Sequence, residues 1–239
     1  MAYMQSTREI ETAYAAFARD YTLAAKELNP YADCDVLDLG TGVAVYSGAF
    51  SPIHGVYAAG LDGPLEDRDF AEIEKFFEKA ERAAVWHTAG KADAPIMSET
   101  ITVFELKGQT LAFPPLPEIT VPQDHHDWLL AHTRSRKGNP AAAEPDLFSS
   151  VVLHMKNTRL YLHPNHTDAA FTHFSHGGAL TLSRPGLQPE TLLTQIQAAS
   201  EYGAHWIALL DSAKLPEIIN NFSHWQYSHQ GTLRGARKK

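Results

Sequence analysis

The stretch GVAVYSGAFSPIHGVYAAGLDGPL, residues 42–65, decides the fold. Two short runs within it, 42–46 and 55–61, are rich in small, β-branched and aromatic residues and are bounded by glycine, Ser-Pro and Asp-Gly. Such composition between turn residues is typical of β-strands. We therefore predict two neighbouring strands, connected at Ser51-Pro52, at the start of a sheet.

Helices are predicted on both sides of these strands. Residues 7–28 place apolar side chains three or four positions apart until Asn29-Pro30, as one face of an amphipathic helix does. A second such pattern covers 67–82, and the two acids near its start are favourable in a first helical turn. Another strand is predicted over 101–106.

Four prolines between Phe113 and Pro122 interrupt regular structure. We place a linker there, at 113–127, between an N-terminal lobe of residues 1–112 and a C-terminal lobe of residues 128–239. Beyond the linker, the basic segment Thr133–Pro145 is expected to be a mobile loop.

The C-terminal lobe is predicted to mix short strands with helices. The expected elements are a hairpin of 150–155 with 158–163, a long strand over 169–182, a helix from Pro189 to Gly203, a strand over 205–210, a short helix over 215–222 and a last strand over 225–233. Together the two lobes predict an α/β protein with a mixed sheet, of the α+β kind.

The composition limits the classes of function. The chain has 239 residues, with a formal net charge of −8, 13 histidines and one cysteine. A lone cysteine provides neither a disulfide framework nor a cysteine-ligated zinc site. The acidic charge disfavours a nucleic-acid partner. The chain also lacks an apolar run of about 18 residues and a signal-peptide pattern, so we expect a cytoplasmic protein with no membrane association.

Residues 42–65, followed by a helix over 69–77 with paired phenylalanines, resemble the N-terminal half of a group of bacterial GNAT superfamily N-acetyltransferases. In those proteins a Gly-Val-Ala strand, a Ser-Pro turn, a glycine-rich strand and such a helix follow in this order. The resemblance implies a GNAT-like acyl-CoA N-acyltransferase fold of two lobes. It further implies acetylation of a small-molecule or peptide amine, with acetyl-CoA as the cofactor.

The C-terminal half resembles the same superfamily in its layout. Residues 178–184 resemble the fourth strand, whose backbone pairs with the pantetheine of acetyl-CoA, and 191–202 resemble the helix whose N-terminal amides bind the pyrophosphate. The cofactor-binding positions that this resemblance implies are Thr181, Leu182, Ser183, Arg184, Gly186, Leu187, Gln188, Asn220 and Asn221.

The pyrophosphate loop departs from the family pattern Arg/Gln-x-x-Gly-x-Gly/Ala. With Arg184 aligned, Leu187 and Pro189 stand where the family has glycine and a second small residue. Pro185 and Pro189 provide no N–H, and Glu190 adds a negative charge. The motif is therefore degraded. A second hypothesis is a non-catalytic or repurposed GNAT-fold protein that binds a different ligand.

Three residues are candidates for acetyl-transfer chemistry. In the superfamily a general base takes the proton of the attacking amine, and His173 and His176 lie on or beside the fourth-strand segment. Histidine suits this role at neutral pH. In the superfamily a tyrosine often protonates the leaving thiolate, and Tyr227 is the candidate here. Its place on the last predicted strand also suits a half-buried packing residue.

Four histidines lie close together as His163-x-x-His166 and His173-x-x-His176. Imidazoles at this spacing could bind zinc, copper or nickel if a hairpin brought the two pairs together. Residues three apart on a strand face opposite sides, so a shared ligand set also needs a bend in the chain. We assign no metal-binding residue, and polar strand faces with loop histidines are the alternative interpretation.

A third hypothesis is an S-adenosylmethionine-dependent methyltransferase. Residues 35–42, DVLDLGTG, resemble the first motif of class I methyltransferases, with Asp62 in the place of the ribose-binding acid. That motif needs a helix after its glycine turn. Residues 43–46, which follow the turn here, have the composition of a strand.

Overall fold

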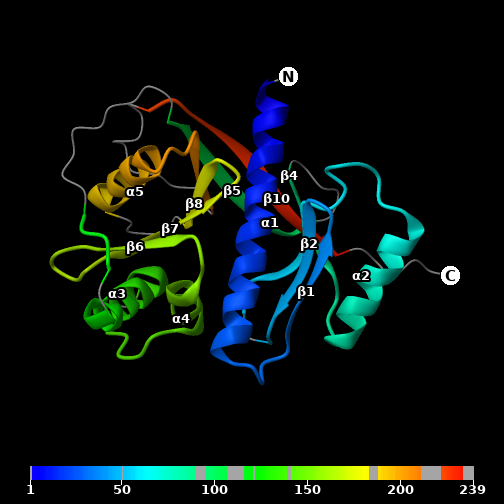
Figure 1. Cartoon of the computed structure of the whole chain (residues 1–239), viewed down its shortest axis with the longest axis horizontal. Coiled ribbons are helices and arrows are strands. Elements are labelled where there is room, and N and C mark those ends of the chain that lie inside the picture. The colour runs from blue at the N-terminus through cyan, green and yellow to red at the C-terminus, as the bar shows by residue number, and fades with distance from the viewer. Residues whose placement is uncertain are drawn as a thin grey trace. The chain divides into compact units, whose positions relative to one another are not determined.

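The computed structural model describes residues 2–49, 51–89, 95–106, 116–120, 122–138, 141–182, 188–210 and 222–233 (Figure 1). Its internal contacts divide the chain into two compact units. The first comprises Met1–Glu99 together with the chain from Tyr227 onward, and the second is Thr100–Gln226. This grouping differs from the predicted lobes 1–112 and 128–239, which stay a prediction.

Five neighbouring strands of the sheet, in the order β1-β2-β3-β4-β10, belong to the first unit, except for the first residues of β10. β1, β2 and β3 are antiparallel, β3 is parallel to β4, and β4 is antiparallel to β10. The elements are α1 (Ala2–Leu28), β1 (Cys34–Leu39), β2 (Gly42–Ser47), β3 (His54–Tyr57), α2 (Asp67–Lys79), β4 (Val85–Ala89) and the later part of β10 (His224–Leu233). The strands and helices predicted around residues 42–65 are thereby confirmed.

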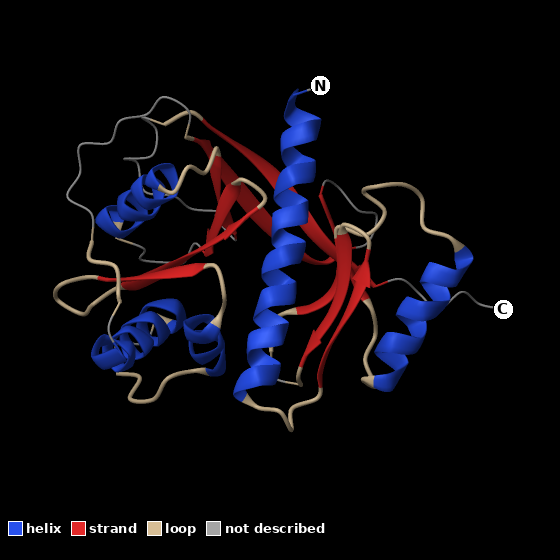
Figure 2. Ribbon diagram, viewed as in Figure 1, coloured by secondary structure: helices blue, strands red, loops and turns tan. Residues whose placement is uncertain are grey.

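Helices α1 and α2 cover opposite faces of this sheet (Figure 2). Ile73 and Phe77 of α2 pack in one cluster with Val56 of β3. The next residue, Tyr57, contacts Tyr14 of α1, with ring centroids 5.3 Å apart. Because neighbouring strand residues point to opposite faces, these two contacts place the helices on opposite sides. The sheet is therefore buried on both faces.

The second unit has the strand order β5-β9-β8-β7-β6. β8 is parallel to β9, and the other described pairs are antiparallel. Its elements are β5 (Pro95–Glu105), which begins in the first unit, the 3-10 turn η1 (Pro122–Asp124), α3 (His125–Lys137), α4 (Leu147–His154), β6 (Thr158–Leu162), β7 (Ala169–Ser175), β8 (Gly178–Leu182), α5 (Pro189–Glu201) and β9 (Trp206–Leu210). Parallel strands on either side of a helix, among antiparallel ones, confirm the predicted mixed α/β class.

Both faces of the second sheet are also covered. Leu192 and Ile196 of α5 pack in one cluster with Phe174 of β7. Phe171, three residues earlier on the same strand, contacts Phe148 of α4 and the ring of His132 on α3. Positions three apart on a strand face opposite sides, so α5 lies on one face and α3 with α4 on the other.

Two predictions for residues 133–155 differ from the structure: the strand over 150–155 is wrong, and the loop over Thr133–Pro145 is contradicted at residues 133–137. Residues 150–155 lie mostly in helix α4 and do not form a strand. The side chain of Asp146 caps this helix by accepting a 2.8 Å hydrogen bond from the Ser149 N–H. The segment Thr133–Pro145, expected to be a mobile loop, begins with the last turn of α3. Three basic residues in this turn, Arg134, Arg136 and Lys137, stabilise the negative C-terminal end of the helix dipole. Gly138, in the left-handed conformation with φ of 60°, ends the helix.

The long strand predicted over 169–182 is a hairpin of β7 and β8. His176 and Gly177 form its two-residue turn, with φ values of 51° and 73°. Positive φ at both positions is the geometry of a type I′ turn, which suits the twist of antiparallel strands. Most of the short helix predicted over 215–222 falls on residues outside the described part of the chain.

Candidate functional site

The β8–α5–β9 segment is where the GNAT resemblance locates acetyl-CoA. β8 pairs with β9 without interruption from Ala179 opposite Ile207 to Leu182 opposite Leu210. On its other edge, β8 pairs with β7 through Gly178, Ala179 and Leu180. A pantetheine chain needs unpaired backbone groups on this strand. Up to Leu182, the last described residue before α5, β9 already occupies that edge of β8.

The N-terminus of α5 holds a buried carboxylate of the protein itself. Asp168, at the start of β7, is 2% exposed. Its Oδ2 accepts hydrogen bonds from the Thr191 hydroxyl at 2.7 Å and from the Gln188 N–H at 3.4 Å. Its Oδ1 accepts a 2.7 Å hydrogen bond from the Ser135 hydroxyl of α3. Asp168 therefore takes the place at a helix start that favours an anion.

The described residues at the start of α5 do not fit a pyrophosphate. Gln188 is the N-cap, and its N–H is directed to Asp168. Pro189 follows at the first helical position and has no N–H, and Glu190 adds a second acid in the first turn. A buried acid and an exposed acid therefore lie where the resemblance implies a doubly charged ligand. Ser183, Arg184, Gly186, Leu187, Asn220 and Asn221, which were also predicted to bind the cofactor, lie outside the described residues.

Thr181 of β8 takes part in a buried polar contact between β7, β8 and α5. Its hydroxyl donates a 2.6 Å hydrogen bond to the Phe171 carbonyl. The buried Gln195 amide donates to the same carbonyl at 2.8 Å and also to the Thr181 hydroxyl. These bonds satisfy buried polar groups next to the last β7–β8 pair, His173 opposite Leu180, and they assign the Thr181 side chain a structural role.

The two predicted base histidines have different surroundings. His173 on β7 is fully buried, and its Nδ1 lies 3.2 Å from the Thr158 hydroxyl of β6. This burial between strands supports a structural role. His176 is exposed in the β7–β8 turn and lies beside a pocket. A role in catalysis stays a prediction for both.

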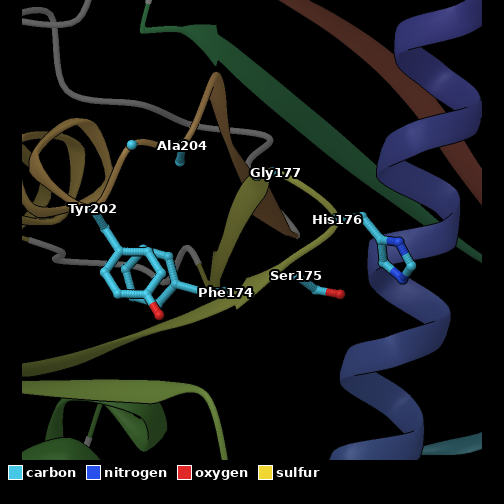
Figure 3. Close-up of a pocket in the computed structure, with 8 residues that line it drawn as sticks. Phe174, Ser175, His176, Gly177, Tyr202 and Ala204 are labelled. Carbon is cyan, nitrogen blue, oxygen red and sulfur yellow. The ribbon is translucent and has the colours of Figure 1, made fainter.

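The pocket beside His176 has a volume of about 220 Å³ and lies between the β7–β8 turn and the α5–β9 turn. Phe174 and Tyr202 form its aromatic wall, with ring centroids 4.2 Å apart (Figure 3). Ser175 and His176 point away from this ring pair in the same view. The lining residues are Phe174, Ser175, His176, Gly177, Gly178, Tyr202, Gly203 and Ala204. None of them is an acid, a lysine or an arginine.

Tyr227, the predicted acid, belongs to the first unit. Its hydroxyl donates a 3.0 Å hydrogen bond to the Glu11 carboxylate of α1, which is 3% exposed. The same carboxylate oxygen lies 2.9 Å from Nδ1 of His229. Neither Glu11 nor His229 was predicted to be a functional residue. The available signal was an acid directly beside Ile10, on the face of α1 that is otherwise apolar.

The four clustered histidines of the sequence do not form a ligand set. His163 Nδ1 lies 2.5 Å from the Asn165 side-chain oxygen, and His166 Nδ1 lies 3.3 Å from the Asp127 carboxylate. Among the described residues, no group of three or more His, Cys, Asp or Glu side chains is arranged to hold a metal ion.

The glycine turn of the methyltransferase-like motif precedes a strand. Residues Cys34–Leu39 and Gly42–Ser47 form the antiparallel pair β1 and β2, joined at Gly40-Thr41. Asp62 accepts a 3.1 Å hydrogen bond from the Thr41 N–H and a 2.5 Å bond from Arg8. This carboxylate therefore stabilises the turn, and the helix that the motif requires is replaced by β2.

Within the described residues, no helix combines the length and the apolar character that a membrane span requires.

Comparison with solved structures finds similarity to proteins of the GNAT type. A GCN5-related N-acetyltransferase from Sphaerobacter thermophilus is 12% identical, with a TM-score of 0.42 over 84% of this chain and 76% of that one. A protein from Novosphingobium aromaticivorans assigned to the GNAT acetyltransferases is 12% identical, with a TM-score of 0.46 over 82% and 89%. A conserved protein of unknown function from Staphylococcus epidermidis is 8% identical, with a TM-score of 0.46 over 84% and 94%.

This similarity concerns the fold alone. No protein-family model matches the chain. No curated protein matches it significantly.

Proposed function

We propose that this chain is a GNAT-fold ligand-binding protein whose C-terminal lobe does not use acetyl-CoA. The observation that carries the proposal is Asp168, a buried carboxylate held at the N-terminus of α5 by Thr191 and Gln188. Glu190 in the first turn of α5 adds to the repulsion of a phosphate group. Like charges a few ångströms apart cost about 1 to 4 kcal/mol each near a protein surface, which corresponds to a loss of affinity of roughly fivefold or more for each charge.

A small, uncharged ligand suits the pocket beside His176 better than a nucleotide does. The pocket has an aromatic wall of Phe174 and Tyr202 and no acidic, lysine or arginine side chain in its lining. Its volume of about 220 Å³ is below the range of about 300–1,000 Å³ that is common for drug-sized ligands. We propose this pocket as the place where a repurposed ligand binds.

Acetyl transfer is the second candidate function. It is favoured by the β8–α5–β9 unit, in which a helix joins two parallel strands as the GNAT resemblance implies. The acceptor would be a small-molecule or peptide amine. The methyltransferase hypothesis has lost its main support, because the glycine turn is followed by β2.

Isothermal titration calorimetry of the full chain separates these functions. We expect no saturable heat with acetyl-CoA or free CoA up to about 1 mM, in about 0.1 M salt. Saturation in the micromolar range, together with release of CoA in the presence of a polyamine or an amino-acid amide, would overturn the proposal and establish acetyl transfer. Binding of S-adenosylmethionine alone would support the third function.

A positive test addresses the pocket. Phenol serves as a small uncharged ring probe, and its binding is followed by NMR chemical shifts of the backbone. We expect the largest shifts at Phe174, His176 and Tyr202, and we expect Ala204→Leu to abolish them by filling the pocket. Shifts spread evenly over the surface, or unchanged in Ala204→Leu, would contradict a ligand site here.

A further inference from the structure

A closed ring of four aromatic side chains lies in the core of the first unit. Tyr14 on α1 contacts Tyr57 on β3, which stacks on His87 of β4. His87 stacks on His229 of β10, and His229 returns to Tyr14. In this order the ring centroids are 5.3, 4.1, 5.5 and 4.9 Å apart. The ring therefore joins α1 to three strands of the same unit.

The two imidazoles have different hydrogen-bond partners. His229, which is 1% exposed, directs Nδ1 to the Glu11 carboxylate at 2.9 Å. His87, which is 6% exposed, directs Nε2 to the main-chain carbonyl of His54 at 3.3 Å. The other ring nitrogen of each is buried and has no hydrogen-bond partner among the described residues. A proton added to either of these nitrogens would consequently have no acceptor in the closed ring.

The space for His87 is provided by Gly55 on the adjacent strand. A Cβ atom at Gly55 would lie 2.7 Å from the His87 ring and 2.6 Å from the Val85 carbonyl oxygen. Gly55 has a φ of 138°, a conformation that other residues rarely adopt. The neighbouring strand is therefore shaped around this imidazole.

The charged and titratable groups around the two imidazoles leave His87 without an acid to pair with. Burial raises the pKa of both Tyr14 and Tyr57, so these side chains stay neutral. Burial and then the nearby His229 lower the pKa of His87 to about 3. The titratable residues in direct contact with the imidazoles are Glu11 and Tyr14 from α1 and His54 and Tyr57 from β3. Glu99 of β5 and Tyr227 of β10 are linked to them through hydrogen bonds with Tyr14 and Glu11.

We propose that this four-ring cluster is an acid-sensitive latch that holds α1 and the C-terminal part of β10 to strands β3 and β4. In the closed latch His87 is neutral, and in the opened first unit water solvates its protonated form. An ordinary histidine has a pKa of about 6.5, above the value in the closed latch. The latch is therefore fully stabilising above about pH 6.5, and its stabilisation is lost as the pH falls toward 3.

The size of the effect follows from the same two pKa values. At pH 4.5 the opened form with a pKa of 6.5 binds a proton about 100 times more often than it stays neutral, whereas the closed form with a pKa of about 3 remains almost entirely unprotonated. At pH 7 the opened form is already partly protonated, so acidification from pH 7 to pH 4.5 should raise the opening equilibrium by about 70-fold.

Hydrogen exchange of the full chain at pH 7.0 and pH 4.5, corrected for intrinsic exchange rates, tests this. Peptides from α1 and β10 report the latch, and peptides from α5 report the other unit. We expect opening of α1 and β10 to increase by about 70-fold in the wild type and by less than tenfold in His87→Phe, which keeps the stacking on Tyr57. His154→Phe, at an exposed histidine of α4, should behave as the wild type does.

Equal increases in the wild type and His87→Phe would overturn the latch. If His87→Phe does not fold, His87→Gln removes the same titration with a smaller side chain. The wild type alone is also decisive: α1 and β10 peptides that keep their protection at pH 4.5 as well as α5 peptides do would refute the proposal.

Discussion

Asp168→Ala tests whether the buried carboxylate secures the start of α5. The substitution removes the acceptor of two 2.7 Å hydrogen bonds, from the Ser135 and Thr191 hydroxyls, and of longer ones from the Ala169 and Gln188 N–H groups. Hydrogen bonds to a charged group contribute about 1.5 to 3 kcal/mol each, and relief of the buried charge offsets part of the loss. We therefore expect the free energy of unfolding to fall by about 3 kcal/mol, or roughly 6–12 °C in Tm for a chain of this size.

Thermal and urea unfolding followed by far-UV circular dichroism measure this change. The matched control is Asp127→Ala in the same unit, because the Asp127 side chain is 47% exposed and its partner His166 is equally accessible. An exposed pair contributes less than about 1 kcal/mol, so the control should unfold nearly as the wild type does. A loss below about 1 kcal/mol for Asp168→Ala would refute the role assigned to this carboxylate.

Two further pairs of variants test packing and charge. Gly55→Ala should cost at least about 2 kcal/mol, because its methyl group would meet a β4 carbonyl oxygen at 2.6 Å, whereas Gly203→Ala, with a φ of 83° and open space, should cost about 1 kcal/mol. Arg136→Ala should cost about 1 to 2 kcal/mol, because its guanidinium pairs with an Asp146 side chain that is 8% exposed, whereas Arg19→Ala breaks only an exposed pair and should cost less than about 0.5 kcal/mol. Thermal unfolding measures both pairs, and equal losses within a pair would contradict the reasoning.

Helical periodicity in the sequence was sufficient to predict a helix where that helix buries one continuous apolar face. The apolar spacing of 7–28 and of 67–82 predicted α1 and α2, and Pro189 marked the first residue of α5. Residues 150–155 were mistaken for a strand because a short apolar run has no clear period. The capping acid Asp146 was the local signal that separates a helix from a strand there.

The candidate site could be predicted only in part. The degraded character of the pyrophosphate loop was readable from Pro189 and Glu190, because the missing N–H and the added charge are properties of single residues. The position of His176 beside a pocket could not be predicted from the sequence. It depends on a turn after β7 and on a second turn after α5, which are distant in sequence.

By itself, the sequence determined helices α1, α2 and α5, most strands, the mixed α/β class and the poor match to an acetyl-CoA motif, because each rests on local periodicity or on the chemistry of one residue. Only the tertiary structure decided that Asp168 lies at the N-terminus of α5 and that Glu11 is the acid in contact with His229. Asp168 reaches Thr191 across 23 positions, and Glu11 reaches His229 across 218. Such pairs arise when sheet register and helix packing bring distant buried groups together, and the cost of leaving them unpaired then selects the contact.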